Sequence, residues 1–217
     1  MNTAVLYDLS TITDHFAESL QLAEDALRLE QAVYGLDSMD ELSFHTVLAT
    51  HLSTHHEVAR EVHYPSTASA KRSHRLRCDL VITPKGSPLK RDTAEPTLFD
   101  PACQCSPSDA LWLEIKVAYQ FREPGVRHTG YSPQWRSAVV EDLRKMEQDA
   151  LIHEAALVLI VFNESAQILE KDLDLFETVL AQKEVLAGFR QVRGVPILDR
   201  IGHSLCTVAL WPTIQRQ

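Results

Sequence analysis

The strongest constraint on the fold is a continuous apolar run of strand length at residues 156–162, Ala-Leu-Val-Leu-Ile-Val-Phe. A strand with one wet face alternates apolar and polar side chains, whereas an unbroken apolar run is typical of a strand covered on both faces. Helical patterns flank this run, at residues 133–153 before it and 165–185 after it. We therefore expect a layered sandwich, with a central β-sheet flanked by helices.

The other segments give an α/β (α+β) order of elements around a mixed sheet. Residues 11–34 show apolar side chains at helical spacing, with threonines able to cap the start and Gly35 to end the helix. A second helix is expected to start near Ser38, because Ser38 and Glu41 have the spacing of a capping box. The remaining expected strands lie at residues 57–64, 75–83 and 111–118, followed by two or three short strands in 189–211 that turn at 194–196 and at Gly202.

The chain of 217 residues is long enough to bury a sizeable core, and we expect a single domain over 1–217. Its parts are an acidic N-terminal helical extension (1–36), a core (38–163) and a C-terminal helix with short strands (164–217). No apolar run approaches the roughly 20 residues that span a bilayer, and no signal peptide is evident. The four cysteines form no CxxC pair. These features predict a reduced, cytoplasmic protein without a membrane segment.

The net charge of −9 is unevenly distributed along the chain. Residues 1–41 hold nine acids and one base, so the acidity belongs to the N-terminal segment. Residues 60–91 hold eight bases and two acids, and this basic region surrounds Asp79. A local basic patch is what phosphate binding requires, and the bulk net charge is a weaker guide.

Two apolar runs carry charged residues that a buried strand would not have, at 75–83 (Arg-Leu-Arg-Cys-Asp-Leu-Val-Ile-Thr) and 111–118 (Leu-Trp-Leu-Glu-Ile-Lys-Val-Ala). Side chains alternate across a strand, so Glu114 and Lys116 are expected on one face. Asp79 is expected to share a face with two arginines, and the opposite face takes Leu76, Cys78, Leu80 and Ile82. If the strands are neighbours, two carboxylates and an ammonium group form a patch that can hold a divalent cation and act on a phosphate.

The order of elements and charges over residues 38–163 resembles the PD-(D/E)xK phosphodiesterase superfamily, the fold of many restriction endonucleases, Holliday-junction resolvases and repair nucleases. The residues in matching positions are Glu41 on the helix, Asp79 on one strand, and Glu114 and Lys116 on the next. The resemblance implies a restriction-endonuclease-like sandwich, here with an extra N-terminal helix. Cys78 stands where the motif has its proline, and a Pro-rich loop must absorb the long spacing before the Glu-x-Lys pair.

The resemblance also implies a metal-dependent nuclease. Mg²⁺, with Mn²⁺ as a substitute, would be held by Asp79, Glu114 and the backbone carbonyl of Ile115. Lys116 would orient the attacking water or stabilise the transition state, and Glu41 would ligate through a water or bind a second ion. The expected substrate is DNA, with RNA still open, and the expected class is an endonuclease of restriction, repair or phage-defence type. By analogy, a homodimer is plausible.

Basic residues near the expected site are the candidates for contacts with the nucleic-acid backbone. They come from the region before Asp79 and from the helix that follows the Glu-x-Lys strand. The candidates are Lys71, Arg72, Arg75, Arg77, Arg144 and Lys145.

The same residues have ordinary structural explanations, which stay open at this point. A Glu-x-Lys pair on a strand is common on solvated faces. Glu41 is explained by helix capping alone, with Asp40 as a competing acid. A non-catalytic binding or scaffold protein on the same fold is therefore the alternative to an enzyme, with its acidic N-terminal helix as a docking surface.

Several histidines and Trp112 also have possible functional roles. The spacing of His51 and His55, with His56 beside them, invites a zinc interpretation, but no glutamate stands where a zinc hydrolase motif requires it. We therefore expect these histidines to be exposed polar side chains. His45 lies one helical turn from Glu41 and either faces the site or packs elsewhere. Trp112 is expected to cover the sheet.

Overall fold

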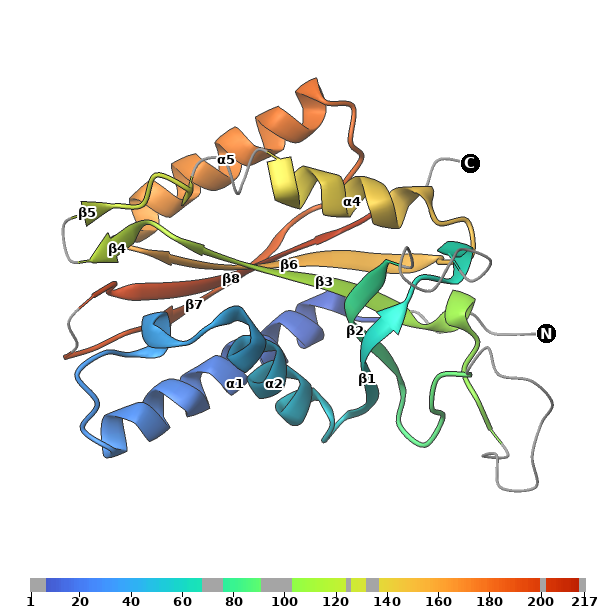
Figure 1. The fold of residues 1–217 in the computed structure, drawn as a ribbon, viewed down its shortest axis with the longest axis horizontal. Helices are drawn as coiled ribbons and strands as arrows, with labels where there is room; N and C mark the ends of the chain where they lie inside the picture. Colours follow the sequence, from blue (N-terminus) through green and yellow to red (C-terminus); the bar gives the residue numbers. More distant parts are fainter. Residues whose placement is uncertain are drawn as a thin grey trace.

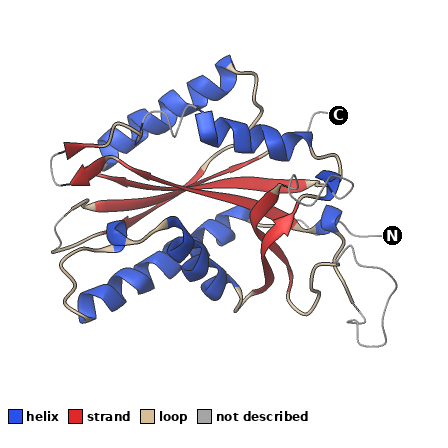
Figure 2. Cartoon of the chain, viewed as in Figure 1, coloured by secondary structure: helices blue, strands red, loops and turns tan. Residues whose placement is uncertain are grey.

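The computed structural model describes residues 7–67, 76–90, 103–123, 126–131, 137–199 and 202–214. These residues form a mixed α/β structure with a six-stranded sheet in the order β1-β2-β3-β6-β8-β7 (Figures 1 and 2). The pair β3–β6 is parallel and every other neighbouring pair in this sheet is antiparallel. The strands are β1 (His56–His63), β2 (Arg77–Pro84), β3 (Leu111–Tyr119), β6 (Glu154–Asn163), β7 (Gln191–Pro196) and β8 (Leu205–Pro212), with a separate hairpin of β4 (Phe121–Glu123) and β5 (Val126–Arg127).

Four α-helices among the described residues cover the two faces of the sheet (Figure 1). Helices α1 (Leu9–Leu29) and α2 (Glu41–Leu52) lie on one face, and α4 (Val139–Gln148) and α5 (Ala166–Gln182) lie on the other. Each face has its own apolar core, because β3 and β6 send alternate side chains into one cluster or the other. The expected sandwich with a mixed sheet flanked by helices is therefore confirmed.

The central strand β6 shows why the sequence pattern was informative. Its side chains are buried from Ala155 to Asn163, and it pairs with β3 on one side and β8 on the other. A strand that has neighbours at both edges and helices on both faces has no wet side, so every position favours an apolar residue. The prediction of a doubly covered strand at 156–162 is confirmed.

Both N-terminal helices begin elsewhere than the sequence predicted. Helix α1 begins two residues before the expected Thr11, because the Asp8 carboxylate accepts hydrogen bonds from the first free backbone N–H groups. The helix ends at Leu29. Helix α2 is capped by Asp40, whose side chain accepts from the backbone N–H of Ser43. Ser38 belongs to a 3₁₀ turn instead, so the predicted capping box is wrong. Glu41 is thus the first residue of α2 and is not needed to cap it.

The C-terminal half follows the predicted order with shorter elements. The helix expected at 165–185 is α5, which Ser165 caps. Helix α4 covers only the part of 133–153 from Val139 to Gln148, with 132–136 outside the described residues. Residues 194–196 were expected to turn but continue β7. Gly202, with φ of +125°, lies in the connection between β7 and β8. The β4–β5 hairpin was not predicted, because its short strands carry no alternating pattern.

Among the described residues, no helix has both the length and the apolar character needed to cross a membrane.

The fold predicts that α2 is fixed to the sheet by its apolar face. Leu48 is fully buried, whereas Leu42 in the same helix is 61% exposed. Leu48→Ala should lower the free energy of unfolding by about 2–5 kcal/mol, because it leaves a cavity in the core. Leu42→Ala, the matched control, should change it by no more than about 0.5 kcal/mol. Urea unfolding of the two variants measures both values, and equal effects would contradict this packing.

Candidate active site

The candidate site lies where the ladder between β1 and β2 is interrupted. The register runs to Arg60↔Leu80 and resumes at Val62↔Cys78, without a pair between Glu61 and Asp79. Glu61 has φ of +52°, the left-handed region that a residue with a side chain rarely adopts. The two residues flanking Asp79, which the sequence placed on one face, pack into opposite cores. Cys78 joins the α4/α5 side and Leu80 joins the α1/α2 side, so that prediction is wrong.

The interruption turns the Asp79 carboxylate toward β3. The pairing of β2 with β3 ends at Leu80↔Leu113, and beyond it Asp79 Oδ2 accepts a hydrogen bond of 2.7 Å from the backbone N–H of Ile115. A side chain therefore satisfies a backbone group that the strand ladder leaves unpaired. Burial raises the pKa of Asp79, although the Ile115 hydrogen bond and the Lys116 ammonium oppose the shift.

Lys116 is the centre of a ring of carboxylates. Its Nζ lies 3.5–4.0 Å from carboxylate oxygens contributed by four different elements. These are Glu41 of α2 at 3.7 Å, Asp79 of β2 at 3.8 Å, Glu114 of β3 at 4.0 Å and Asp142 of α4 at 3.5 Å. Burial favours the neutral amine, but the carboxylates outweigh it and hold the pKa of Lys116 above its ordinary value. Asp142 was not predicted, although Arg144 and Lys145 of the same helix were candidates for contacts near the site.

Glu114 is the most deeply buried acid of the site, with 2% of its surface exposed. Its Oε1 accepts a hydrogen bond from the Tyr64 hydroxyl at 2.6 Å and lies 2.6 Å from Lys145 Nζ. Burial, and then the charge of Asp79, raise the pKa of Glu114 to about 7, against the lowering effect of Lys145. The role of Tyr64 was missed by sequence reasoning, because a tyrosine at a strand end carries no motif. Trp112 stacks on the Tyr64 ring and is buried in the core, as expected.

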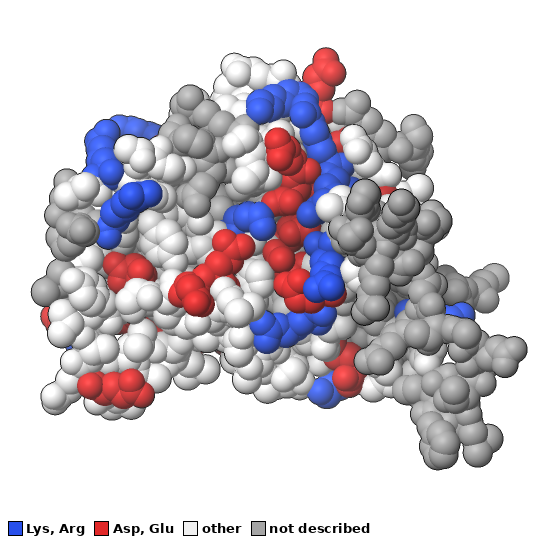
Figure 3. All heavy atoms as spheres, viewed as in Figure 1, with Lys and Arg blue, Asp and Glu red and all other residues white. Residues whose placement is uncertain are grey.

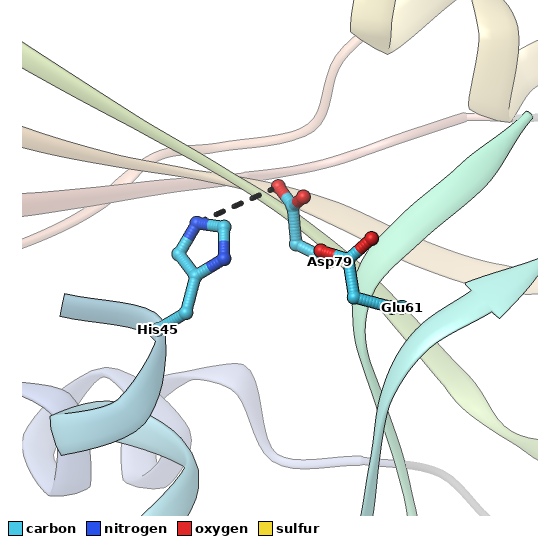
Figure 4. A group of neighbouring side chains, drawn as sticks. All are labelled: His45, Glu61 and Asp79. Atoms are coloured by element: carbon cyan, nitrogen blue, oxygen red, sulfur yellow. Dashed lines mark ion pairs between the residues drawn. The ribbon is translucent and has the colours of Figure 1, made fainter. Parts of the chain in front are cut away.

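A second group of possible ligands lies on the other side of Asp79 (Figure 4). His45 of α2, Glu61 of β1 and Asp79 of β2 each offer one ligand atom, and these atoms all lie within 4.8 Å of one another. His45 Nε2 is also 4.0 Å from Glu41 Oε1. The sequence had left open whether His45 faces the site, and the structure places it there. Glu61 was missed, because the sequence does not give the register of β1 against β2, which places Glu61 opposite Asp79.

The predicted metal set is brought together only in part. Asp79 and Glu114 are close enough for each to influence the pKa of the other. The carbonyl oxygen of Ile115, expected as a third ligand, accepts a hydrogen bond of 3.1 Å from Lys116 Nζ. The donors are hard oxygens and suit Mg²⁺, so the residues fit the expected ion once the lysines give way.

The predicted nucleic-acid contacts do not lie together in one place. Lys145 lies inside the site, whereas Arg144 donates a hydrogen bond to the backbone oxygen of Lys183 and points toward the end of α5. Arg77 is half exposed and lies 3.8 Å from Glu61. On the face seen in Figure 3, acidic and basic side chains gather between α4 and the β1–β2 end of the sheet. The other candidates, Lys71, Arg72 and Arg75, lie outside the described residues.

Histidines from α1, from the end of α2 and from the start of β1 form a cluster that the sequence did not predict. His15 of α1 stacks on His55, with ring centroids 4.1 Å apart, and lies 6.0 Å from His51 and 6.5 Å from His56. His55 is exposed as expected, but His51 and His56 are partly buried, so the prediction of three exposed side chains is wrong for them. Packing between α1, α2 and β1 explains the cluster.

A scan of protein-family models and searches of curated proteins and of solved structures found no match for this chain. Its function is therefore inferred from the residues and distances described above.

The histidine cluster predicts a loss of stability in acid. Burial and the charge of His55 lower the pKa of His15, and burial and His15 lower that of His56. The unfolded chain then binds more protons than the folded chain as the pH falls through about 6.5, so folding weakens there. The contribution of His15 and His56 to the free energy of unfolding should drop between pH 7.5 and pH 5.5, while the raised pKa of Glu114 acts in the opposite direction.

His15→Gln should reduce this dependence on pH, whereas His153→Gln, at an exposed site, should leave it as in the wild type. Chemical unfolding at a series of pH values measures the slopes. Identical slopes for the wild type and His15→Gln would contradict the prediction.

Proposed function

We propose that this chain is a metal-dependent phosphodiesterase that hydrolyses DNA, on a restriction-endonuclease-like fold. The observation that carries the proposal is the ring around Lys116, in which carboxylates from α2, β2, β3 and α4 meet within 4.0 Å of one ammonium group. Three of the four acids, and the lysine itself, are the residues that the PD-(D/E)xK resemblance singles out. Separate surface ion pairs do not converge in this way from four elements.

The charge balance of the site supports a bound cation. Four carboxylates face two ammonium groups, Lys116 and Lys145, which leaves an excess of two negative charges when all six groups are ionised. Partly buried charges of one sign are costly unless they are compensated. A divalent cation would compensate this excess, and hard carboxylate oxygens are the ligands that Mg²⁺ prefers.

Each residue then has a role that its position supports. Asp79 and Glu114 would hold the Mg²⁺, which when bound activates a water and neutralises charge on the phosphate. Lys116 is positioned to orient the attacking water or to stabilise the negative charge that develops on the phosphate oxygens. Glu41, at the solvent-facing start of α2, would bind through a water. Lys145 would move from Glu114 to a phosphate of the substrate when the cation takes its place.

DNA is the proposed substrate, because the basic residues beside the site suit a phosphate backbone. Arg77 is exposed at the edge of β2, and Lys145 is already inside the site. The metal chemistry does not depend on the sugar, so the assay below includes RNA as well as DNA.

A non-catalytic binding protein is the second candidate, and one observation favours it. The lysines already occupy the acids, with Lys145 Nζ 2.6 Å from Glu114 and 3.0 Å from Asp142. Such a network stabilises the buried charges without any ion. The two candidates differ in turnover, since only an enzyme releases cleaved nucleic acid.

The enzyme proposal predicts cleavage of plasmid or linear DNA in Mg²⁺ or Mn²⁺. Lys116→Met should lower the rate about 10²–10³-fold, because it removes a charge that stabilises the transition state. Asp79→Asn should lower it at least as much. Lys171→Met, at an exposed position on α5, should cleave at the wild-type rate. Parallel reactions with RNA test the choice of substrate.

The readout is the appearance of nicked and linear products on gels, with circular dichroism to verify that each variant is folded. Equal cleavage by the wild type, Lys116→Met and Asp79→Asn would exclude this site. Nucleic-acid binding without cleavage in either metal would favour the binding protein.

A further inference from the structure

We infer that His45, Glu61 and Asp79 form a binding site for a divalent transition-metal ion such as Mn²⁺ or Co²⁺, on the α2/β1 side of Asp79 (Figure 4). The three side chains come from three elements and offer one imidazole nitrogen and two carboxylate oxygens. This site deepens the proposed function, on which its catalytic meaning rests, but its ability to bind metal is independent of catalysis. It shares only Asp79 with the pair predicted to hold Mg²⁺.

His45 is the strongest indication that the group serves a ligand. The residue is 5% exposed, and its Nε2 has no hydrogen-bond partner among the described residues. A buried nitrogen without a partner costs about 1–3 kcal/mol, so native structures rarely keep one without a use for it. This nitrogen lies 4.0 Å from Asp79 Oδ2, too far for a hydrogen bond but on the same side as the acids. A metal ion between them would satisfy both.

Glu61 gives a second, independent indication. It adopts φ of +52° in the middle of β1, although it is not a glycine, and the ladder with β2 is interrupted at this residue. Such a conformation costs about 1–3 kcal/mol and persists where the surroundings require it. The Glu61 carboxylate lies beside Asp79, and the flanking pairs Arg60↔Leu80 and Val62↔Cys78 also place the two residues opposite each other. Glu61 also forms an ion pair of 3.8 Å with Arg77, and both side chains are about half exposed. Such an exposed ion pair is too weak to explain the strained backbone of Glu61.

The kind of donor indicates the kind of metal. Mg²⁺ prefers oxygen ligands, whereas an imidazole nitrogen together with carboxylates suits first-row transition ions. Ligands on opposite sides of an ion with bonds of about 2.1 Å lie about 4.2 Å apart. The ligand atoms here lie within 4.8 Å of one another, so modest side-chain rotations would close the site. We therefore expect Mn²⁺ and Co²⁺ to bind more tightly than Mg²⁺.

The surroundings explain why the ion would sit on this side. On the other side of Asp79, Glu114 is neutralised by Lys145 at 2.6 Å and by the Tyr64 hydroxyl. Asp79 Oδ2 is held by the Ile115 N–H, which fixes the direction of the carboxylate. The imidazole and Glu61 are free of such strong partners. An ion at this position would therefore not have to displace Lys145, whereas Lys116 Nζ, 3.8 Å from Asp79 Oδ2, would have to turn away from that oxygen.

Metal titration of the 217-residue chain tests the inference. Calorimetry with Mn²⁺ should show one site with at least tenfold higher affinity than Mg²⁺, and Co²⁺ should give a visible absorption band when bound. His45→Gln and Glu61→Gln should each weaken Mn²⁺ binding by about tenfold or more and reduce the Co²⁺ band. His56→Gln and Glu57→Gln change the same residue types at the start of β1, outside the group, and should bind as the wild type does.

The outcomes separate this site from the proposed nuclease. Wild-type Mn²⁺ affinity in folded His45→Gln and Glu61→Gln would overturn the metal site, and so would a wild type that binds neither Mn²⁺ nor Co²⁺. DNA cleavage that depends on Lys116 but not on His45 or Glu61 would leave the nuclease proposal standing alone. Binding that needs His45 and Glu61, in a protein that cuts no nucleic acid, would establish the site and refute the nuclease.

Discussion

The hydrogen bond from the Ile115 N–H to the Asp79 carboxylate is the interaction on which the candidate site depends. It replaces a backbone hydrogen bond of the sheet at the point where β2 leaves β3. The strand β2 can therefore separate from β3 without leaving the Ile115 N–H unpaired. The separation opens the end of the sheet between α2 and α4. Glu41, Glu61 and Lys116 reach the same small volume only because Asp79 is fixed there.

Charge compensation then decides how the site is occupied. Lys116 and Lys145 neutralise part of a group of acids that could not remain buried alone, and burial raises the pKa of Glu114 to about 7. The same lysines are the groups that a phosphodiesterase needs near a phosphate. Because the two lysines neutralise part of the negative charge of the carboxylates, the site is stable without an ion. A bound cation would compensate the remaining negative charge. Stability and the proposed chemistry therefore use the same residues.

Sequence patterns predicted the fold best where a single effect, such as the burial of an apolar run, decided the local structure. The run at 156–162 was correctly predicted to be a doubly covered strand, because an unbroken apolar run favours cover on both faces of the strand. The capping prediction at Ser38 failed because Asp40 was an equally good cap two residues later. The strict alternation expected around Asp79 failed because it assumed a continuous ladder, and the left-handed Glu61 interrupts it.

The sequence by itself determined the order of the main elements, the doubly covered strand at 156–162 and the presence of Asp79, Glu114 and Lys116 on two apolar strands, because these follow from periodicity and charge within short segments. Only the tertiary structure decided which other side chains join them. Asp142, Tyr64, His45 and Glu61 come from elements distant in the chain, and each is brought in by packing. Contacts between distant segments depend on how helices settle against a twisted sheet, which no local pattern encodes.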